Sequence, residues 1–401
     1  MPLRPPAGYI YPGYDPLQVP NAPTIGTATG GDAQASVAFT APSNVGGSAI
    51  SAYYAVSNPD RITASGASSP VTVTGLTNGT AYTFQVWALN TFGPSPFSAA
   101  SGSVTPAPPY AFWFGGSTGG NVIDRVAVTS LSNAIDFADF GTGLPTASTA
   151  AGGSNTRAVL AANNTTSNVI QYFTYAAGGV TADFGDLTAL IAAMAGCSNN
   201  TRAVFAGGDN GSTASVATMN YVTIATTGNA ISFGNLSVAR GWAQGCATST
   251  RGVFGGGNDF ASGAYYNILD YITIATTGNA IDFGDLTVER ERISSCSNAT
   301  RGIWAGGRTT GGTRVNVIDY VTMASTGNAT DFGDMLYAAQ GMAAACTATR
   351  GLIAGGQTTV GFNNINYITI DSAGNAIDFG DLSRTHAGFC ATCDGNPAQQ
   401  P

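Results

Sequence analysis

From residue 110 onward, the chain repeats one pattern of hydrophobic and polar positions six times. In the copy that begins at Arg251, the apolar pair Val253-Phe254 precedes two glycines, and an alternating run, Tyr271-Ile272-Thr273-Ile274, follows a variable loop. A T-G-N turn then precedes Ile281-Asp282-Phe283, and a run from Ile293 to Cys296 ends the copy. Short alternating runs between turn signals are typical of half-buried strands, so each copy predicts four strands.

The copies recur with a period of about 50 residues, which predicts a supersecondary unit that is completed by its neighbours. Each copy begins at a marker residue, and the markers are Tyr110, Arg157, Arg202, Arg251, Arg301 and Arg350. The glycine pairs are Gly115-Gly116, Gly207-Gly208, Gly256-Gly257, Gly306-Gly307 and Gly355-Gly356, with Ala162-Asn163 in the second copy. The final segment, Arg384 to Cys393, matches the segment that elsewhere precedes a marker. We therefore expect the last strand to pair beside the first and to close a ring of six.

The period, the glycine pair and the strand that ends in a glycine turn together resemble the kelch family of β-propellers. The resemblance covers Tyr110 to about Asn396 and implies a six-bladed β-propeller over residues 108–396. Kelch repeats usually carry an outer-strand Trp, whereas this chain has Phe137, Phe184, Phe233, Phe283, Phe332 and Phe379 in a comparable place. Kelch-like propellers host unrelated functions, so the resemblance implies an architecture and no activity.

Residues 21–107 show a different pattern, with short alternating strands over a length that suits one immunoglobulin-like sandwich. Tyr82 lies six residues after Leu76 in G-L-T-N-G-T-A-Y, as in a tyrosine corner, where the hydroxyl bonds to an upstream backbone group. The segment resembles a fibronectin type III domain, with Phe39 in place of the usual second-strand Trp. This resemblance implies a spacer or a weak carbohydrate-adhesive module, of which we favour the spacer. The predicted fold class is all-β.

The first 20 residues carry six prolines, which keep a segment extended and unable to fold alone. They form either a disordered leader or a docking arm whose tyrosines, Tyr9, Tyr11 and Tyr14, bury against a larger assembly; we favour the arm. Ser101 to Pro109 predicts a semi-rigid linker, and residues 397–401 predict a short tail.

Composition narrows the function classes. Only 9% of the residues are charged, every cation is Arg, and the net charge is −8, so we expect neither a nucleic acid nor an anionic membrane as partner. No apolar run is long enough to span a membrane, and the N-terminus lacks the apolar core of a signal peptide. The Gly-rich, Lys-free composition is common in extracellular and virion fibres. It predicts a virion component that is assembled in the host cytoplasm and exposed outside the cell.

The residues that carry most enzyme chemistry are scarce. His386 is the only histidine, which excludes a multi-histidine metal site, and we expect it to be a strand residue. Cysteines recur near the repeat period and predict one small buried residue per unit: Cys197, Cys246, Cys296, Cys346 and Cys390. Cys390 and Cys393 have the spacing of a redox or half-zinc motif, but no second pair lies nearby. We predict no metal and no cofactor.

The repeated charged residues also favour structural roles. The Arg markers and the Asp of each D-F-G, at Asp183, Asp282, Asp331 and Asp378, predict hydrogen-bonding posts in each repeat rather than a calcium or kinase site. Glu289 and Glu291 alternate with Arg290 and Arg292, which predicts a salt-bridge ladder on a strand rather than a pair of catalytic carboxyls. The sialidase Asp-box is absent, and we predict no enzyme.

The loops after the glycines vary most between copies, and in a propeller they share one rim with the connections to the innermost strands. Their aromatic and arginine side chains suit stacking on sugar rings or docking on a protein, although simple surface variation is an equal alternative. The candidate binding residues are Trp242, Phe260, Tyr265, Tyr266, Arg308, Arg314 and Phe362.

The order of arm, sandwich and propeller resembles that of tail-associated structural proteins of tailed marine or cyanobacterial bacteriophages. The resemblance implies a non-enzymatic tail fibre or adhesin, present in multiple copies per particle. Its arm would hold other virion proteins, and its propeller would bind a host-surface glycan or protein. A capsid or tail-tube decoration protein and a secreted carbohydrate-active enzyme are the alternatives.

Overall fold

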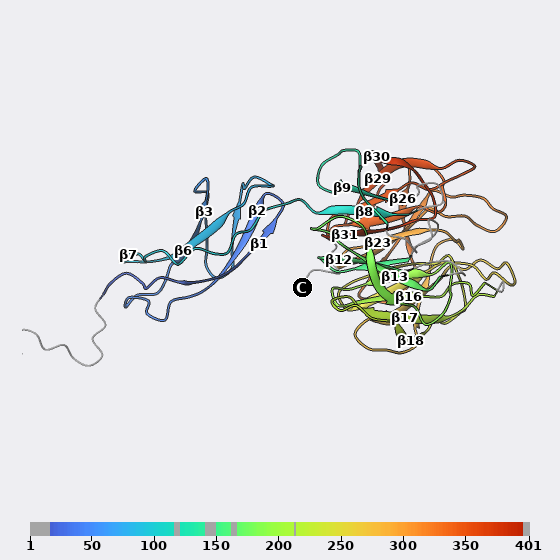
Figure 1. Ribbon diagram of the computed structural model, residues 1–401, viewed down its shortest axis with the longest axis horizontal. Helices are drawn as coiled ribbons and strands as arrows, with labels where there is room; N and C mark the ends of the chain where they lie inside the picture. The colour runs from blue at the N-terminus through green and yellow to red at the C-terminus, as the bar shows by residue number, and fades with distance from the viewer. Residues whose placement is uncertain (1–16, 116–120, 141–149, 162–166, 212–213, 396–401) are drawn as a thin grey trace, which may run out of the picture. The chain divides into compact units, whose positions relative to one another are not determined.

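The computed structural model describes residues 17–115, 121–140, 150–161, 167–211 and 214–395. All regular elements in these ranges are β-strands, so the all-β fold class is confirmed (Figure 1). The strands form two compact units, Met1–Pro108 and Pro109–Pro401. A search of the described residues finds no helix with the length and apolar character that a membrane span requires. The tyrosines of the predicted docking arm and the Ala162-Asn163 pair lie outside the described residues.

The first unit contains two antiparallel sheets, with strand orders β1-β2-β5 and β4-β3-β6-β7. The strands are β1 (Thr24–Gly31), β2 (Gln34–Thr40), β3 (Ala52–Asn58), β4 (Thr63–Gly66), β5 (Val71–Thr74), β6 (Thr83–Asn90) and β7 (Gly93–Pro94). Tyr82 is fully buried, and its hydroxyl accepts the backbone N–H of Thr77 at 3.1 Å and donates to Asp60 Oδ2 at 2.7 Å. The predicted bond from this hydroxyl to an upstream backbone group is therefore confirmed.

The second unit contains six four-stranded antiparallel sheets and is propeller-like. We number them sheet 1 to sheet 6 and give their strands from the innermost outward. Sheet 1 is β31 (Cys390–Cys393), β8 (Tyr110–Phe114), β9 (Val122–Ala127) and β10 (Ile135–Asp139); sheet 2 is β11 (Ala150–Gly153), β12 (Arg157–Ala161), β13 (Val169–Thr174) and β14 (Ala182–Asp186); sheet 3 is β15 (Ala195–Ser198), β16 (Arg202–Ala206), β17 (Thr218–Thr223) and β18 (Ile231–Asn235). Sheet 4 is β19 (Gln244–Ala247), β20 (Arg251–Gly255), β21 (Ile268–Thr273) and β22 (Ile281–Asp285); sheet 5 is β23 (Ser294–Ser297), β24 (Arg301–Ala305), β25 (Val317–Thr322) and β26 (Thr330–Asp334); sheet 6 is β27 (Ala343–Cys346), β28 (Arg350–Ala354), β29 (Phe362–Thr369) and β30 (Ile377–His386).

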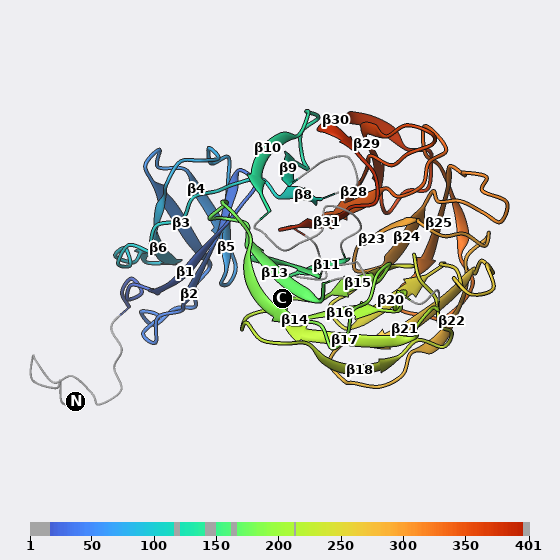
Figure 2. The same ribbon diagram turned by 45° about the vertical axis from the view of Figure 1, so that its right-hand side comes forward.

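The innermost strands contact one another in the order β11, β15, β19, β23, β27 and β31, and β31 also contacts β11. All six line one central cavity of about 70 Å³. Figure 2 shows β11, β15, β23 and β31 gathered toward the middle of the unit and β14, β18 and β22 at its periphery. The last described strand, β31, pairs with β8, the first strand of this unit. Ala391 lies opposite Trp113 and Cys393 opposite Ala111, so the predicted pairing is confirmed.

The Arg markers join neighbouring sheets, as predicted for hydrogen-bonding posts. Each guanidinium lies 4.3–4.8 Å from the ring centroid of a Tyr in its own sheet. Its Nη1 donates to a backbone carbonyl of the next sheet at 2.6–3.0 Å. The pairs are Arg157–Ile224, Arg202–Ile274, Arg251–Met323, Arg301–Ile370 and Arg350–Val128. The last pair joins sheet 6 to sheet 1.

The predicted role of the D-F-G aspartates is wrong: Asp183, Asp282, Asp331 and Asp378 are exposed on the outermost strands. The outer joints use the backbone and the T-G-N asparagine instead. In sheet 4, the N–H of Asp285 donates to Asn328 Oδ1 of sheet 5 at 3.1 Å, and the N–H of Gly327 donates to the carbonyl of Phe283 at 2.7 Å. A β-carbon on Gly284 would lie 2.4 Å from the Gly327 oxygen, so the joint requires glycine.

All six cysteines are buried free thiols. Three occupy the same strand position and face the following sheet, but Cys346 is one position later in its strand, and Cys390 is two positions earlier. Because side chains alternate along a strand, Cys346 faces backward and its Sγ donates to the Ser297 carbonyl at 3.0 Å. The predicted equivalence of five cysteines is therefore wrong, although their burial is as predicted.

Candidate functional site

A buried polar contact fixes each described connection between the outermost strand of one sheet and the innermost strand of the next. The third strand of the receiving sheet carries a buried Asp or Asn, and its partner comes from the connection or, for His386, from the last residue of the outermost strand. The contacts are Arg240–Asp270 at 2.8 Å, Arg290–Asp319 at 2.9 Å, His386–Asp124 at 3.4 Å, Tyr337–Asn366 at 2.9 Å and Thr188–Asn220. His386 ends β30, so its prediction as a strand residue is confirmed.

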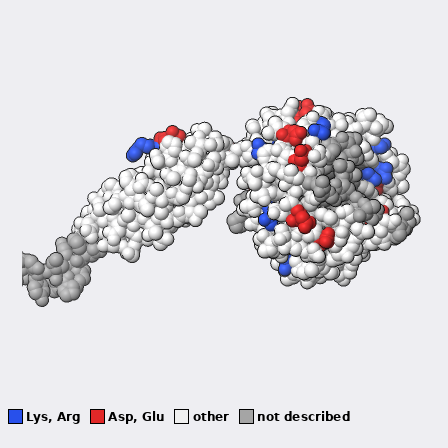
Figure 3. Space-filling view, in the orientation of Figure 1, with Lys and Arg blue, Asp and Glu red and all other residues white. Residues whose placement is uncertain are grey.

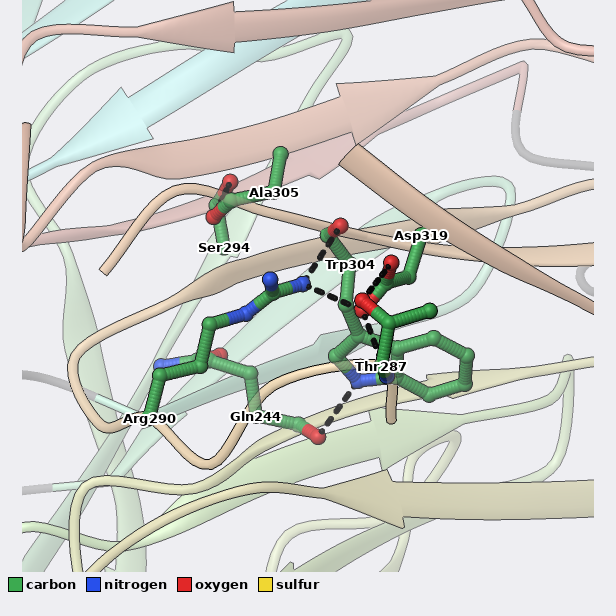
Figure 4. Close-up of polar contacts among 7 residues, drawn as sticks. All are labelled: Gln244, Thr287, Arg290, Ser294, Trp304, Ala305 and Asp319. Carbon is green, nitrogen blue, oxygen red and sulfur yellow. Dashed lines mark hydrogen bonds and ion pairs between the residues drawn. The ribbon is translucent and has the colours of Figure 1, made fainter. Parts of the chain in front are cut away.

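The contact at sheet 5 is fully buried (Figure 4). Arg290 Nη2 donates to Asp319 Oδ2 at 2.9 Å and to the carbonyl of Trp304 at 3.3 Å. Thr287 Oγ1 donates to Asp319 Oδ1 at 2.6 Å. Burial lowers the pKa of the Arg290 guanidinium, and the Asp319 carboxylate opposes this shift. These groups hold the connection in place.

The repeats share a rule for these contacts that sequence analysis missed. The residue seven positions after the outer-strand Phe is Arg240, Arg290 or His386 wherever the third strand carries Asp. It is Ile191 or Ala339 where the third strand carries Asn, and a neighbouring Thr or Tyr then bonds the amide. A buried carboxylate is costly without a polar partner, so Arg or His stands opposite each Asp, and an apolar residue stands at the same position opposite each Asn. An alignment of the copies with one another shows this covariation between the two positions.

Two positions further along, each of these connections contains one residue with positive φ. We call these residues the mouth row: Ala193 (φ 55°), Trp242 (53°), Arg292 (52°), Gly341 (69°) and Gly388 (66°). The backbone N–H of each member after Ala193 donates to the backbone carbonyl of the previous member, at 2.8–3.0 Å. The innermost strand begins two residues after each member, so the row borders one mouth of the central cavity.

Glycine is the usual residue in this conformation, yet two neighbouring members of the row carry the large side chains of Trp242 and Arg292. The Arg292 guanidinium lies 3.8 Å from the Trp242 ring centroid, and the Phe260 ring lies 6.4 Å from Trp242. Non-glycine residues with positive φ concentrate at functional sites, where surrounding contacts maintain the strain. These two positions therefore identify the candidate site.

A buried carboxylate connects this pair to the next loop. Glu291 is fully buried; its Oε1 accepts from Arg308 Nε at 2.5 Å and lies 3.4 Å from Arg292 Nε as an ion pair. We call Trp242, Phe260, Glu291, Arg292 and Arg308 the mouth cluster. Burial lowers the pKa of the Arg292 guanidinium, Glu291 opposes the shift, and the Arg308 charge adds to it. The predicted ladder on a strand is wrong, because this segment is a connection in which Arg290 turns inward to Asp319.

The other candidate residues from the sequence lie nearby but outside the cluster. Tyr265 pairs through its backbone with Asn258, which in turn pairs with Gly241 beside Trp242. Tyr266 accepts the Arg290 N–H with its carbonyl. Arg314 donates from Nη2 to the Thr358 carbonyl at 3.1 Å, and Phe362 packs on Tyr337 with ring centroids 4.8 Å apart. All four side chains are half-buried. Sequence analysis missed Glu291 and Arg292 as site residues because it assigned them to the ladder.

Among the described residues, metal binding and nucleophilic attack by a cysteine find little support. No group of three or more His, Cys, Asp or Glu side chains is placed to hold a metal ion in the ranges that the structure describes. Burial raises the pKa of the Cys197 and Cys246 thiols, which disfavours the nucleophilic thiolate. The charged side chains on the face seen in Figure 3 are scattered and mixed in sign.

No protein-family model matches the chain, and no curated protein matches it. Among solved structures, the chain is similar to that of YjhT, with a TM-score of 0.53 and 8% sequence identity. The similarity covers 63% of this chain and 89% of that chain. At this identity the likeness shows the fold alone, and it agrees with a propeller-like arrangement of the repeated sheets.

Proposed function

We propose that this chain is a non-enzymatic bacteriophage virion protein, a tail fibre or adhesin that binds a host-surface glycan or protein through the mouth of a propeller. The second unit is then a six-bladed, kelch-like β-propeller. Its six sheets, the order of its inner strands and the pairing of β31 with β8 support this interpretation. The first unit is a fibronectin type III spacer, supported by its two sheets and by the buried Tyr82 contact.

The observation that carries the binding function is the placement of Trp242 and Arg292 at mouth-row positions that other sheets fill with glycine or alanine. The recurring arginines, asparagines and glycines are already engaged in joints between sheets. The residues that differ from copy to copy lie in the loops, which is where binding residues usually occur. The virion location rests on the composition, which is Gly-rich, free of Lys and low in charge.

The test is retention of the purified full chain on immobilised bacterial envelope fractions, with chromatography of the supernatant for released fragments. We expect retention without depolymerisation, and at least tenfold weaker retention for Trp242→Gly at an unchanged melting temperature. Glycine suits the backbone at this position, so the variant removes the side chain without straining the fold. Release of oligosaccharides in step with binding would indicate the carbohydrate-active enzyme. Absence of retention on every fraction would contradict the proposal.

A further inference from the structure

Three buried acceptor oxygens lie around the mouth cluster with no hydrogen-bond donor among the described residues. They are Glu291 Oε2, Gln340 Oε1 and Asn258 Oδ1. Glu291 is fully buried, Gln340 is 4% exposed and Asn258 is 9% exposed. A buried acceptor without a donor is destabilising, so three of them on one face of the second unit require an explanation.

Backbone contacts place these acceptors along one strip of the loop face. Glu291 and Gln340 each precede a mouth-row residue, and the N–H of Gly341 donates to the carbonyl of Arg292 at 2.8 Å. Asn258 exchanges backbone hydrogen bonds with Gly241, the neighbour of Trp242. The strip therefore runs across sheets 4, 5 and 6, with the rings of Trp242 and Phe260 at one end.

The chemistry of the strip selects the ligand class. A cation is disfavoured because the guanidinium groups of Arg292 and Arg308 already flank the Glu291 carboxylate. A simple anion is disfavoured because three of the unpaired atoms are acceptor oxygens and one of them belongs to a carboxylate. Arg292 Nε of the same cluster is a donor with no hydrogen-bond acceptor in the described chain, so the ligand must accept as well as donate. An uncharged ligand with several O–H donors and an apolar face satisfies both the acceptors and the aromatic rings. Sugars have these features.

We infer that the mouth cluster, together with the neighbouring Gln340 and Asn258, binds a neutral sugar. The hydroxyl groups of the sugar donate to Glu291, Gln340 and Asn258, and its ring lies against Trp242. This inference rests on the proposed function and narrows it from a host-surface glycan or protein to an uncharged carbohydrate. It gives the three acceptors a common purpose, because one polyhydroxylated ligand supplies all the missing donors.

The test titrates the full chain with neutral hexaoses of glucose, galactose and mannose by calorimetry. We expect at least one to bind, its permethylated form to fail, and Gln340→Met to weaken binding about tenfold, which corresponds to the loss of one hydrogen bond. Gln340→Met should leave the melting temperature unchanged or raised, because it removes an unpaired buried acceptor. Gln357→Met, on the loop facing Gln340, is the matched control and should bind like the wild type.

Equal binding of the permethylated sugar, or an unaffected Gln340→Met variant, would overturn the inference. So would binding restricted to sulfated oligosaccharides, or to envelope proteins. If the chain is retained on envelope fractions but binds no neutral hexaose, the inference fails and the proposed function stands. If it is retained on none of them, both fail.

Discussion

At the scale of single residues, the buried Asp or Asn of the third strand is held by a charged contact in some sheets and by a neutral contact in others. Sheet 5 pairs Arg290 with Asp319, whereas sheet 3 has Ile191 and Asn220 at the equivalent positions and bonds the amide through Thr188. Thr287 occupies the same place in sheet 5 as Thr188 does in sheet 3, four residues after the outer-strand Phe. The chain therefore contains its own template for a neutral contact at this site.

The template gives a prediction. Arg290→Ile alone leaves Asp319 buried without its cation and should lower the free energy of unfolding by about 3–5 kcal/mol. The double variant Arg290→Ile, Asp319→Asn reproduces the sheet 3 contact, with Thr287 as donor, and should recover stability to within about 1 kcal/mol of the wild type. Urea unfolding of both variants and of Asp319→Asn completes the cycle. A double variant as unstable as Arg290→Ile would refute the rule.

The same residues show why part of the site was out of reach of sequence analysis. The candidates Trp242, Phe260 and Arg308 could be chosen because aromatic and cationic residues stand out in variable loops. Glu291 and Arg292 could not, because alternation of charge along a sequence resembles a strand, and only backbone geometry reveals the positive φ at Arg292. Once that geometry is known, Gly341 and Gly388 are recognisable in the sequence as the residues at the equivalent place in other copies.

At the scale of elements, the outermost strands meet through backbone contact. Gly284→Ala would place a β-carbon 2.4 Å from the Gly327 oxygen at a φ of 144°, and we expect a loss of about 2 kcal/mol or more. The control is Gly278→Ala, in the turn before the same strand, where a β-carbon would meet no atom within 4 Å. That variant should stay within about 1 kcal/mol of the wild type in urea unfolding. Equal losses in the two variants would show that the joint does not constrain the glycine.

The end of β31 carries a pH-sensitive group. Asp394 Oδ1 accepts the N–H of Tyr110 at 2.6 Å, and burial raises the pKa of this carboxyl from 3.8 to about 6. Between about pH 6 and 4, the folded chain binds a proton here that the unfolded chain does not bind, so falling pH favours folding at this residue. The stability of the wild type relative to Asp394→Asn should therefore rise by on the order of 2 kcal/mol from pH 7.5 to pH 4. Urea unfolding at several pH values measures this difference, and a constant difference would contradict the burial of the carboxyl.

At the scale of the whole molecule, β31 pairs with β8 of sheet 1 although it is the last strand in the described part of the chain. Removing residues 390–401 would leave the β8 edge unpaired and remove the contacts of β31 with β27 and β11. We therefore expect a lower melting temperature and aggregation. Removing only residues 396–401 is the control and should leave the melting temperature unchanged. A truncated chain without β31 that stays monomeric and equally stable would contradict the role of this pairing.

The large-scale features followed from the sequence because they repeat. Four strands per copy, six copies and the pairing of Cys390–Cys393 with the first strand all come from a period that is visible in the letters. Details set by register did not follow. Cys346 is 50 residues after Cys296 whereas its strand begins 49 residues after that of Cys296, so it is one position later in the strand and faces the opposite side.

The most direct test of the account is amide hydrogen exchange of the full chain with and without a neutral hexaose that it binds. The account predicts added protection in the connections that hold Trp242, Glu291 and Gln340 and in the glycine loops that face them. Protection confined to the turns at the opposite ends of the strands, around residues 248–251 and 298–301, or to the first unit, would show that the mouth is not where this molecule binds.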